Sequence, residues 1–177
     1  MKLLKHLATI TRHKLLVMKL CFKCGLYRQG LLHDISKYSI IELKAGAKYY
    51  QGNRSPNGIQ RELLGYSSAW LHHKGRNKHH WEYWVDFNRD GVIPAKMPIN
   101  YIVEMFCDRI AATMVYKGKD YNNQAPLDYY NKTRSYYVIE ASTDEAIKDM
   151  LTYLADNDLG KTIKYIRHNY LNNKNLS

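Results

Sequence analysis

Histidines are concentrated in one short stretch of the chain. The segment "HHKGRNKHH", residues 72–80, holds four of the eight histidines of the 177-residue sequence, with Lys74, Arg76 and Lys78 between them. Imidazole nitrogens are common ligands of transition metals, whereas lysine and arginine attract phosphate groups. The segment therefore predicts a metal site, a basic patch for a phosphate-rich partner, or both.

Ionisable residues also occupy positions that apolar patterns would bury. One face of a predicted helix over residues 2–22 consists of Leu3, His6, Ile10, His13, Val17 and Leu20. In a second predicted helix, near 98–116, Asp108 lies on the stripe formed by Tyr101, Met105, Ala112 and Val115. The pair His33-Asp34 falls in a segment that reads as one or two helical pieces. Because an unpaired buried carboxylate is costly, Asp34 and Asp108 need histidines or a metal beside them.

Each of these residues also has a simpler interpretation, because a histidine on an apolar face is more often a hydrogen-bonded core residue than a ligand. Together, however, histidines and carboxylates on separate helices can converge, and this mixture suits iron, manganese, zinc or nickel. Adjacent residues of an ordinary helix point about 100° apart, so His33 and Asp34 would not both face a single ion. The pair therefore favours a centre with two divalent ions.

The choice of ligands within residues 72–80 follows from another stripe. Helical spacing relates Ile59, Leu63, Tyr66, Trp70 and His73, so His73 would lie on the buried face. His73 is therefore a better candidate ligand than His72, and the sequence leaves the choice between them open. His79 and His80 follow a turn marked by Gly75 and Asn77, and the sequence leaves open which of them binds.

After residue 79 the sequence predicts an aromatic loop or broken helix with a turn at "NRDG". Three further helices follow: a tyrosine-rich helix about 127–137, a helix introduced by a capping box at Ser142 and Glu145, and a last helix about 159–170. Alternating strand patterns are not evident. We therefore predict an all-α, single-domain helical bundle over residues 1–177. The metal site would lie in a core of about residues 3–117, and C-terminal helices of about residues 124–172 would complete the bundle.

Composition limits the partners. The 27 Lys and Arg against 16 Asp and Glu give a net charge of +11, which favours an anionic small-molecule substrate, nucleic acid or an acidic surface. The apolar runs are shorter than the roughly 18 residues that span a bilayer, and the charged start "MKLLKHLATITRHK" is unlike a signal peptide. These features predict a cytoplasmic protein without a membrane partner; they do not define an oligomeric state.

The three cysteines do not form a disulfide framework. Cys21 and Cys24 form a lone CxxC, for which a zinc knuckle or redox pair is the alternative to simple packing at the end of a helix. Cys107 falls in an apolar helical pattern. We expect all three to be core residues.

The order His13, His33-Asp34, His73, His79-His80, Asp108 resembles the H…HD…H…H…D signature of the HD-domain superfamily of metal-dependent phosphohydrolases. "HDISK" is similar to the HDxxK form of the HD-GYP branch, and "HHWE" to the HHE of that branch. The chain is also similar to a family of short uncharacterised proteins with HD, H…N.HH.E and a later Asp. The resemblance covers residues 13–108. Since "VDFNRDG" follows in place of GYP, specificity for cyclic dinucleotides is not implied.

This resemblance implies a helical bundle of the HD type and a set of residue roles. Asp34 would bridge two ions, and Lys37 would lie close to the substrate phosphate and the bridging water. If only one of His79 and His80 binds, the site would be mononuclear. The terminal metal ligands implied are His13, His33, His73, His79, His80 and Asp108.

The resulting prediction is a metal-dependent phosphohydrolase that acts on a nucleotide or related small phosphate ester. Asp34 would hold or deprotonate a metal-activated water, Lys37 would neutralise charge on the phosphate, and Glu82 would orient His79 or His80 or receive a proton. Candidate substrate-binding residues are Lys37, Arg76, Lys78 and Arg109. The alternatives are a di-iron HD-type oxygenase and a non-catalytic basic helical module that binds nucleic acid.

Overall fold

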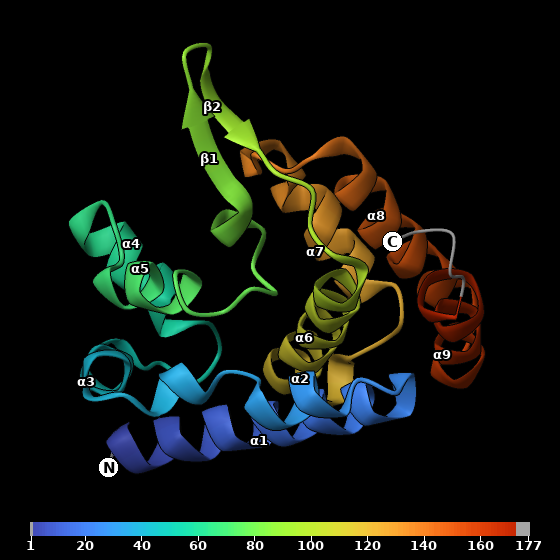
Figure 1. Cartoon of the computed structure of the whole chain (residues 1–177). Coiled ribbons are helices and arrows are strands. Elements are labelled where there is room, and N and C mark those ends of the chain that lie inside the picture. Colours follow the sequence, from blue (N-terminus) through green and yellow to red (C-terminus); the bar gives the residue numbers. More distant parts are fainter. Residues whose placement is uncertain (1, 173–177) are drawn as a thin grey trace.

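The computed structural model describes residues 2–172, which form nine α-helices and one β-hairpin (Figure 1). The predicted all-α class is confirmed, apart from the small hairpin. The helices are α1 (Lys2–Cys24), α2 (Tyr27–Leu32), α3 (Ile40–Tyr49), α4 (Pro56–Leu64), α5 (Ser68–Lys74), α6 (Ile99–Lys117), α7 (Ala125–Thr133), α8 (Ala141–Asp156) and α9 (Leu159–Ile166). The strands are β1 (Val85–Asn88) and β2 (Gly91–Pro94). Short 3₁₀ segments at Ile35–Tyr38, Trp81–Trp84, Gly118–Asp120 and Arg134–Tyr136 and a π-helical turn at Arg167–Leu171 complete the described chain.

Helix α1 is the base on which the other helices assemble. It packs against α2, α3 and α6, while α4 and α5 pack on α3. In Figure 1, α3, α4 and α5 lie on one side of α6, and α7, α8 and α9 lie on the other. Within residues 2–172, no helix combines the length and the apolar character that crossing a membrane requires.

The main core lies between α1, α6, α8 and α9. On α1, His6, Ile10, His13, Val17 and Leu20 are buried, as their spacing predicts, whereas Leu3 is 45% exposed. The core continues through a run of buried residues on α6 and through the inner faces of the C-terminal helices. The three cysteines are unpaired core residues, as the packing interpretation predicts.

The predicted continuous stripe from Ile59 to His73 is wrong, because the segment forms two helices. Gly65 adopts a left-handed conformation (φ +78°) that ends α4. The Ser67 side chain then accepts a hydrogen bond from the backbone N–H of Trp70 and caps α5. The helical register restarts at this break, so Leu63 and Tyr66 are exposed while Ile59 and His73 remain buried.

The expectation of no strands is also wrong. Residues 85–94 form an antiparallel hairpin in which Val85 pairs with Pro94 and Asn88 with Gly91. The turn predicted at "NRDG" is confirmed, and Gly91 has the positive φ (+115°) that glycine tolerates best. Each strand has only four residues, too few for an alternating pattern to stand out.

The start of α8 differs from the predicted capping box. Glu140, not Ser142, is the N-cap, and its carboxylate accepts the backbone N–H groups of Ser142 and Thr143 at 2.9 and 3.0 Å. Burial alone would raise the pKa of Glu140, but these hydrogen bonds lower it to about 2. The exposed Glu145 makes no hydrogen bond or ion pair with residues 2–172.

We therefore expect Glu140→Ala to lower the free energy of unfolding by about 1 kcal/mol. Because the folded-state pKa lies below the ordinary value of 4.5, the contribution is present above pH 4.5 and is lost as pH falls toward 2. Urea denaturation at several pH values measures it, with Glu145→Ala as the charge-matched control. Equal losses in the two variants would contradict the capping role.

Candidate metal centre

The backbone at Asp34 has an unusual conformation. Its φ and ψ are 54° and 25°, and among residues 2–172 no other non-glycine residue has a positive φ. The pair His33-Asp34 lies in a turn between α2 and the 3₁₀ segment Ile35–Tyr38, not inside a helix as predicted. The 100° separation of helical neighbours does not apply to this turn, and both side chains point into the same buried region.

A first cluster joins α1, the turn and α6. Oδ2 of Asp34 lies 3.2 Å from Nε2 of His33 and 3.5 Å from Nε2 of His13. Oδ1 of Asp108 lies 2.9 Å from Nε2 of His13 and 3.5 Å from Nε2 of His33. One potential ligand atom from each of the four residues lies within 4.8 Å of the other three, so this cluster could hold an ion.

A second cluster lies on the other side of the same aspartate. Oδ1 of Asp34 lies 3.2 Å from Nε2 of His73 and 3.4 Å from Nε2 of His79. The Nε2 atoms of His73 and His80 are 2.9 Å apart. Asp34, His73, His79 and His80 form another group that could hold an ion. The two clusters share only Asp34, which presents one carboxylate oxygen to each.

Several ligand atoms are buried without a hydrogen bond to residues 2–172. They are Nε2 of His13, His33 and His79 and Oδ1 of Asp34, whereas Oδ2 of Asp34 is paired with the ammonium of Lys37. These atoms are close to one another, yet no two of them form a hydrogen bond. Leaving buried polar atoms unsatisfied costs free energy unless another group binds them. Imidazole nitrogens and carboxylate oxygens in this arrangement fit divalent transition ions.

Two buried glutamates, which the sequence analysis missed, orient the histidines. Oε1 of Glu104 lies 2.9 Å from Nδ1 of His33 and 3.0 Å from Nδ1 of His79. An ionised carboxylate only accepts, so Nδ1 of each histidine donates, and Nε2 has a lone pair whenever the ring is neutral. Glu104 lies four residues before Asp108, on the same face of α6, and this spacing was the signal that could have identified it.

The second glutamate, Glu42 on α3, holds the two histidines at the end of α5. Oε2 of Glu42 accepts from Nδ1 of His73 at 2.9 Å, and Oε1 accepts from Nδ1 of His72 at 2.7 Å. His72 belongs to neither cluster, in line with the sequence-based preference for His73. One turn further along α3, Gly46 lets this helix lie against α1, where a Cβ would collide with the His6 ring.

The charges of the cluster are strongly coupled. Burial opposes ionisation of Asp34, but His33, Lys37 and His73 outweigh it and hold the pKa of Asp34 well below its ordinary value. Burial also opposes protonation of His33, yet the neighbouring carboxylates raise its pKa well above the usual range. Burial, with His79 and His73 nearby, lowers the pKa of His80 strongly. His80 is therefore neutral, with one of its two ring nitrogens unprotonated.

Two lysines hold Asp34 and its turn. Nζ of Lys37 lies 2.5 Å from Oδ2 of Asp34, and the Lys37 side chain is 24% exposed, so it connects the cluster with solvent. Lys14 donates to the backbone carbonyls of His33 (2.5 Å) and Leu31 (3.0 Å). Asp34 itself is only 1% exposed and Asp108 17%, so the cluster opens on the side of Asp108 and Lys37.

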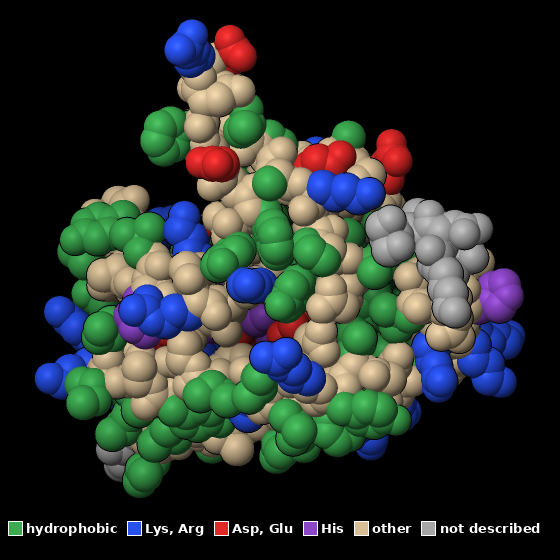
Figure 2. Space-filling view, viewed as in Figure 1, with side chains coloured by type: hydrophobic (Ala, Val, Ile, Leu, Met, Phe, Trp, Pro, Cys, Tyr) green, Lys and Arg blue, Asp and Glu red, His purple; other side chains and the backbone are tan. Residues whose placement is uncertain are grey.

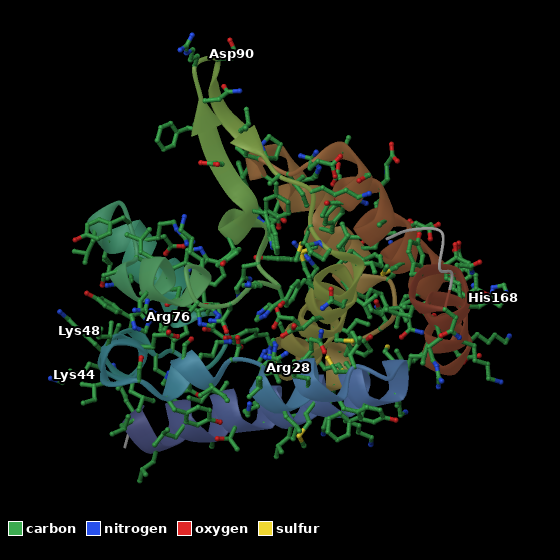
Figure 3. The ribbon with its side chains drawn as sticks, in the orientation of Figure 1. Arg28, Lys44, Lys48, Arg76, Asp90 and His168 are labelled. Carbon is green, nitrogen blue, oxygen red and sulfur yellow. The ribbon has the colours of Figure 1, made fainter. Side chains whose placement is uncertain are left out.

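The other candidate residues lie around the clusters and not within them. Arg76, labelled in Figure 3 near the end of α5, donates to the carbonyl of His72, and Lys78 is exposed with its ammonium over the Tyr83 ring. Arg109 packs on the rings of Tyr130 and Tyr137. The substrate-binding roles given to Arg76, Lys78 and Arg109 stay predictions.

Glu82 contacts a tryptophan instead of a histidine. Its Oε1 accepts from Nε1 of Trp70 at 3.3 Å, and the Trp70 ring packs edge-on to His80. The orienting role predicted for Glu82 at His79 belongs to Glu104. Burial raises the pKa of Glu82, so a role in proton transfer stays a prediction.

The fold and the site define an all-α protein built around a buried cluster of histidines and carboxylates. Residues 2–156 match the sequence model described as Family of unknown function (DUF5662), and the chain belongs to this family. The matched range includes both clusters, Glu42 and Glu104. Comparison with curated proteins and with solved structures gives no match.

The turn geometry leads to a prediction about Lys14. Lys14→Met removes the donor for two backbone carbonyls, so we expect the free energy of unfolding to fall by about 1–3 kcal/mol. Lys19→Met, an exposed lysine of the same helix, is the control, and urea denaturation is the measurement. A Lys14→Met variant as stable as Lys19→Met would show that these hydrogen bonds do not hold the turn.

Proposed function

We propose that this protein is a metal-dependent phosphohydrolase with a helical bundle of the HD type, acting on a nucleotide or related small phosphate ester. The observation that carries the proposal is Asp34, which presents its two oxygens to two separate histidine clusters. A carboxylate placed in this way is suited to bridging two ions. The order of the ligands along the chain and the charge of +11 support the same conclusion.

The residues fit two divalent ions such as iron, manganese, zinc or nickel. His13, His33, Asp34 and Asp108 would hold one, and Asp34, His73, His79 and His80 the other. Bound ions would supply a nucleophilic water at neutral pH and would polarise the phosphoryl oxygen.

The chain's own groups would bind and orient the substrate. Lys37 reaches from Asp34 toward the open side of the cluster, where its ammonium would neutralise a phosphate. Figure 2 shows histidine and acidic side chains in a recess at the centre of one face, with Lys and Arg side chains nearby. The buried walls of the site would exclude bulk water, and Glu82, with its raised pKa, would be able to hold a proton.

Metal content tests the ligand assignment. We expect wild-type protein to bind two ions per chain, and His33→Ala, Asp108→Ala and His73→Ala each to lose at least one. His72→Ala removes the neighbouring imidazole that lies outside both clusters, so it should retain two. Elemental analysis after dialysis measures the stoichiometry. Wild-type protein that binds no ion, or equal loss in the His72 and His73 variants, would contradict the assignment.

Hydrolysis tests the reaction. We expect the metal-loaded protein to release phosphate from a member of a panel of nucleotides, cyclic nucleotides and phosphomonoesters. Lys37→Met should lower kcat roughly 100-fold or more, because the developing charge on phosphate loses its partner. Lys44, which points away from α3 into solvent in Figure 3, provides the control Lys44→Met, which should leave kcat unchanged.

The same experiments separate the alternatives. Two ions with no hydrolysis of any panel member would contradict the phosphohydrolase proposal; a mixed-valent iron signal in that protein would favour a di-iron oxygenase. Nucleic-acid binding that weakens steeply with salt and survives metal removal would favour the basic binding module. The cytoplasmic location stays a prediction.

A further inference from the structure

A single oxygen of Glu104 connects the two clusters. Oε1 of Glu104 lies 2.9 Å from Nδ1 of His33, which belongs to the first cluster, and 3.0 Å from Nδ1 of His79, which belongs to the second. The two imidazole rings also pack together, with centroids 4.4 Å apart. Glu104 is 4% exposed, so water does not compete effectively for these hydrogen bonds.

Glu42 provides a contrast within the same site. It contacts His73, a member of the second cluster, and His72, which belongs to neither. Both glutamates fix the orientation of imidazole rings by accepting from Nδ1. Only Glu104 does so for one potential ligand of each ion site.

We infer that Glu104 is a positioning residue that couples the two ion sites, so that the ions bind as a linked pair. This inference rests on the proposed metal centre. An ion held by His33 restricts that ring and, through the shared oxygen, restricts Glu104. The fixed glutamate holds His79 with its Nε2 lone pair toward the second site. The His79 ring therefore loses less conformational freedom when the second ion binds.

The geometry also allows another ligand arrangement, because His33, His79 and Glu104 are close enough to hold an ion themselves. In that arrangement, Nδ1 of both histidines would lose its proton and Glu104 would be a ligand. The hydrogen-bonding distances and the two other clusters, which already use the Nε2 atoms, favour the positioning role.

Zinc titration against a competing chelator tests the coupling one site at a time. The Asp108→Ala background removes a ligand of the first cluster only, and the His73→Ala background a ligand of the second cluster only. In both backgrounds we expect Glu104→Gln, which keeps the side-chain size, to weaken the remaining ion by roughly 10-fold or more. Glu42→Gln should weaken the ion of the second cluster in the Asp108→Ala background and leave the first-cluster ion within about twofold in the His73→Ala background.

In otherwise wild-type protein, Glu104→Gln should also reduce the cooperativity between the two zinc ions, whereas Glu42→Gln should not. An effect of Glu104→Gln on one ion alone, or unchanged cooperativity, would overturn the inference. A wild-type stoichiometry of three ions would overturn it as well, because Glu104 would then be a ligand. If wild-type protein binds no zinc, manganese or iron, the proposed function fails instead.

A measurement without metal distinguishes positioning from a merely structural role. Nitrogen NMR of the imidazoles reports which ring nitrogen carries the proton. In protein stripped of metal, Glu104→Ala should shift His33 and His79 away from Nδ1 protonation, while Glu42→Ala should shift His72 and His73. Circular dichroism verifies that the variants are folded. Unchanged His33 and His79 spectra in folded Glu104→Ala would contradict the positioning role.

Discussion

The structure of the site depends on the burial of one carboxylate. Asp34 is almost inaccessible to water, and an isolated charge in such a position would be strongly unfavourable. Nitrogen atoms from His33, Lys37 and His73 surround it, and their charge keeps it ionised. Its left-handed backbone adds a strain of order 1–3 kcal/mol, which the surrounding structure must offset. Lys14 holds the preceding carbonyl of His33 and so stabilises the turn that creates this geometry.

The need to surround Asp34 explains why distant parts of the chain meet here. Helix α1 contributes His13, the end of α5 and the following turn contribute three histidines, and α6 contributes Asp108 and Glu104. A straight helix presents residues three or four apart to one point, so no single helix could supply all of these groups. Glu42 and Glu104 contact the histidines from outside the two clusters. They fix the orientations of the imidazole rings, so that the ligand nitrogens point toward Asp34.

The sequence predicted those parts of the site that follow regular periodicity. His13 and Asp108 were identified because a polar residue interrupts an apolar helical stripe. The α1 stripe is buried except for Leu3, whereas of the predicted α6 stripe only Met105 is fully buried and the other members are half-buried. Where the backbone departs from helix, prediction failed: the turn at Asp34 and the break at Gly65 depend on local dihedral angles that the apolar pattern does not encode. Glu104 was overlooked because the predicted stripe ran through Tyr101, Met105 and Asp108 and did not include position 104.

Contacts with the C-terminal helices fix the orientation of α6 and of its site residues. Asp108 and Arg109 are consecutive on α6, so their side chains point about 100° apart. Asp108 faces the histidines, while Arg109 lies against the rings of Tyr130 and Tyr137 and donates to the Tyr137 hydroxyl. Asp144 on α8 accepts from Tyr130 and from Arg134, which ties this aromatic layer to the next helix. Rotation of α6 would break these contacts, and the C-terminal helices thereby fix the direction in which Asp108 and Glu104 enter the cluster.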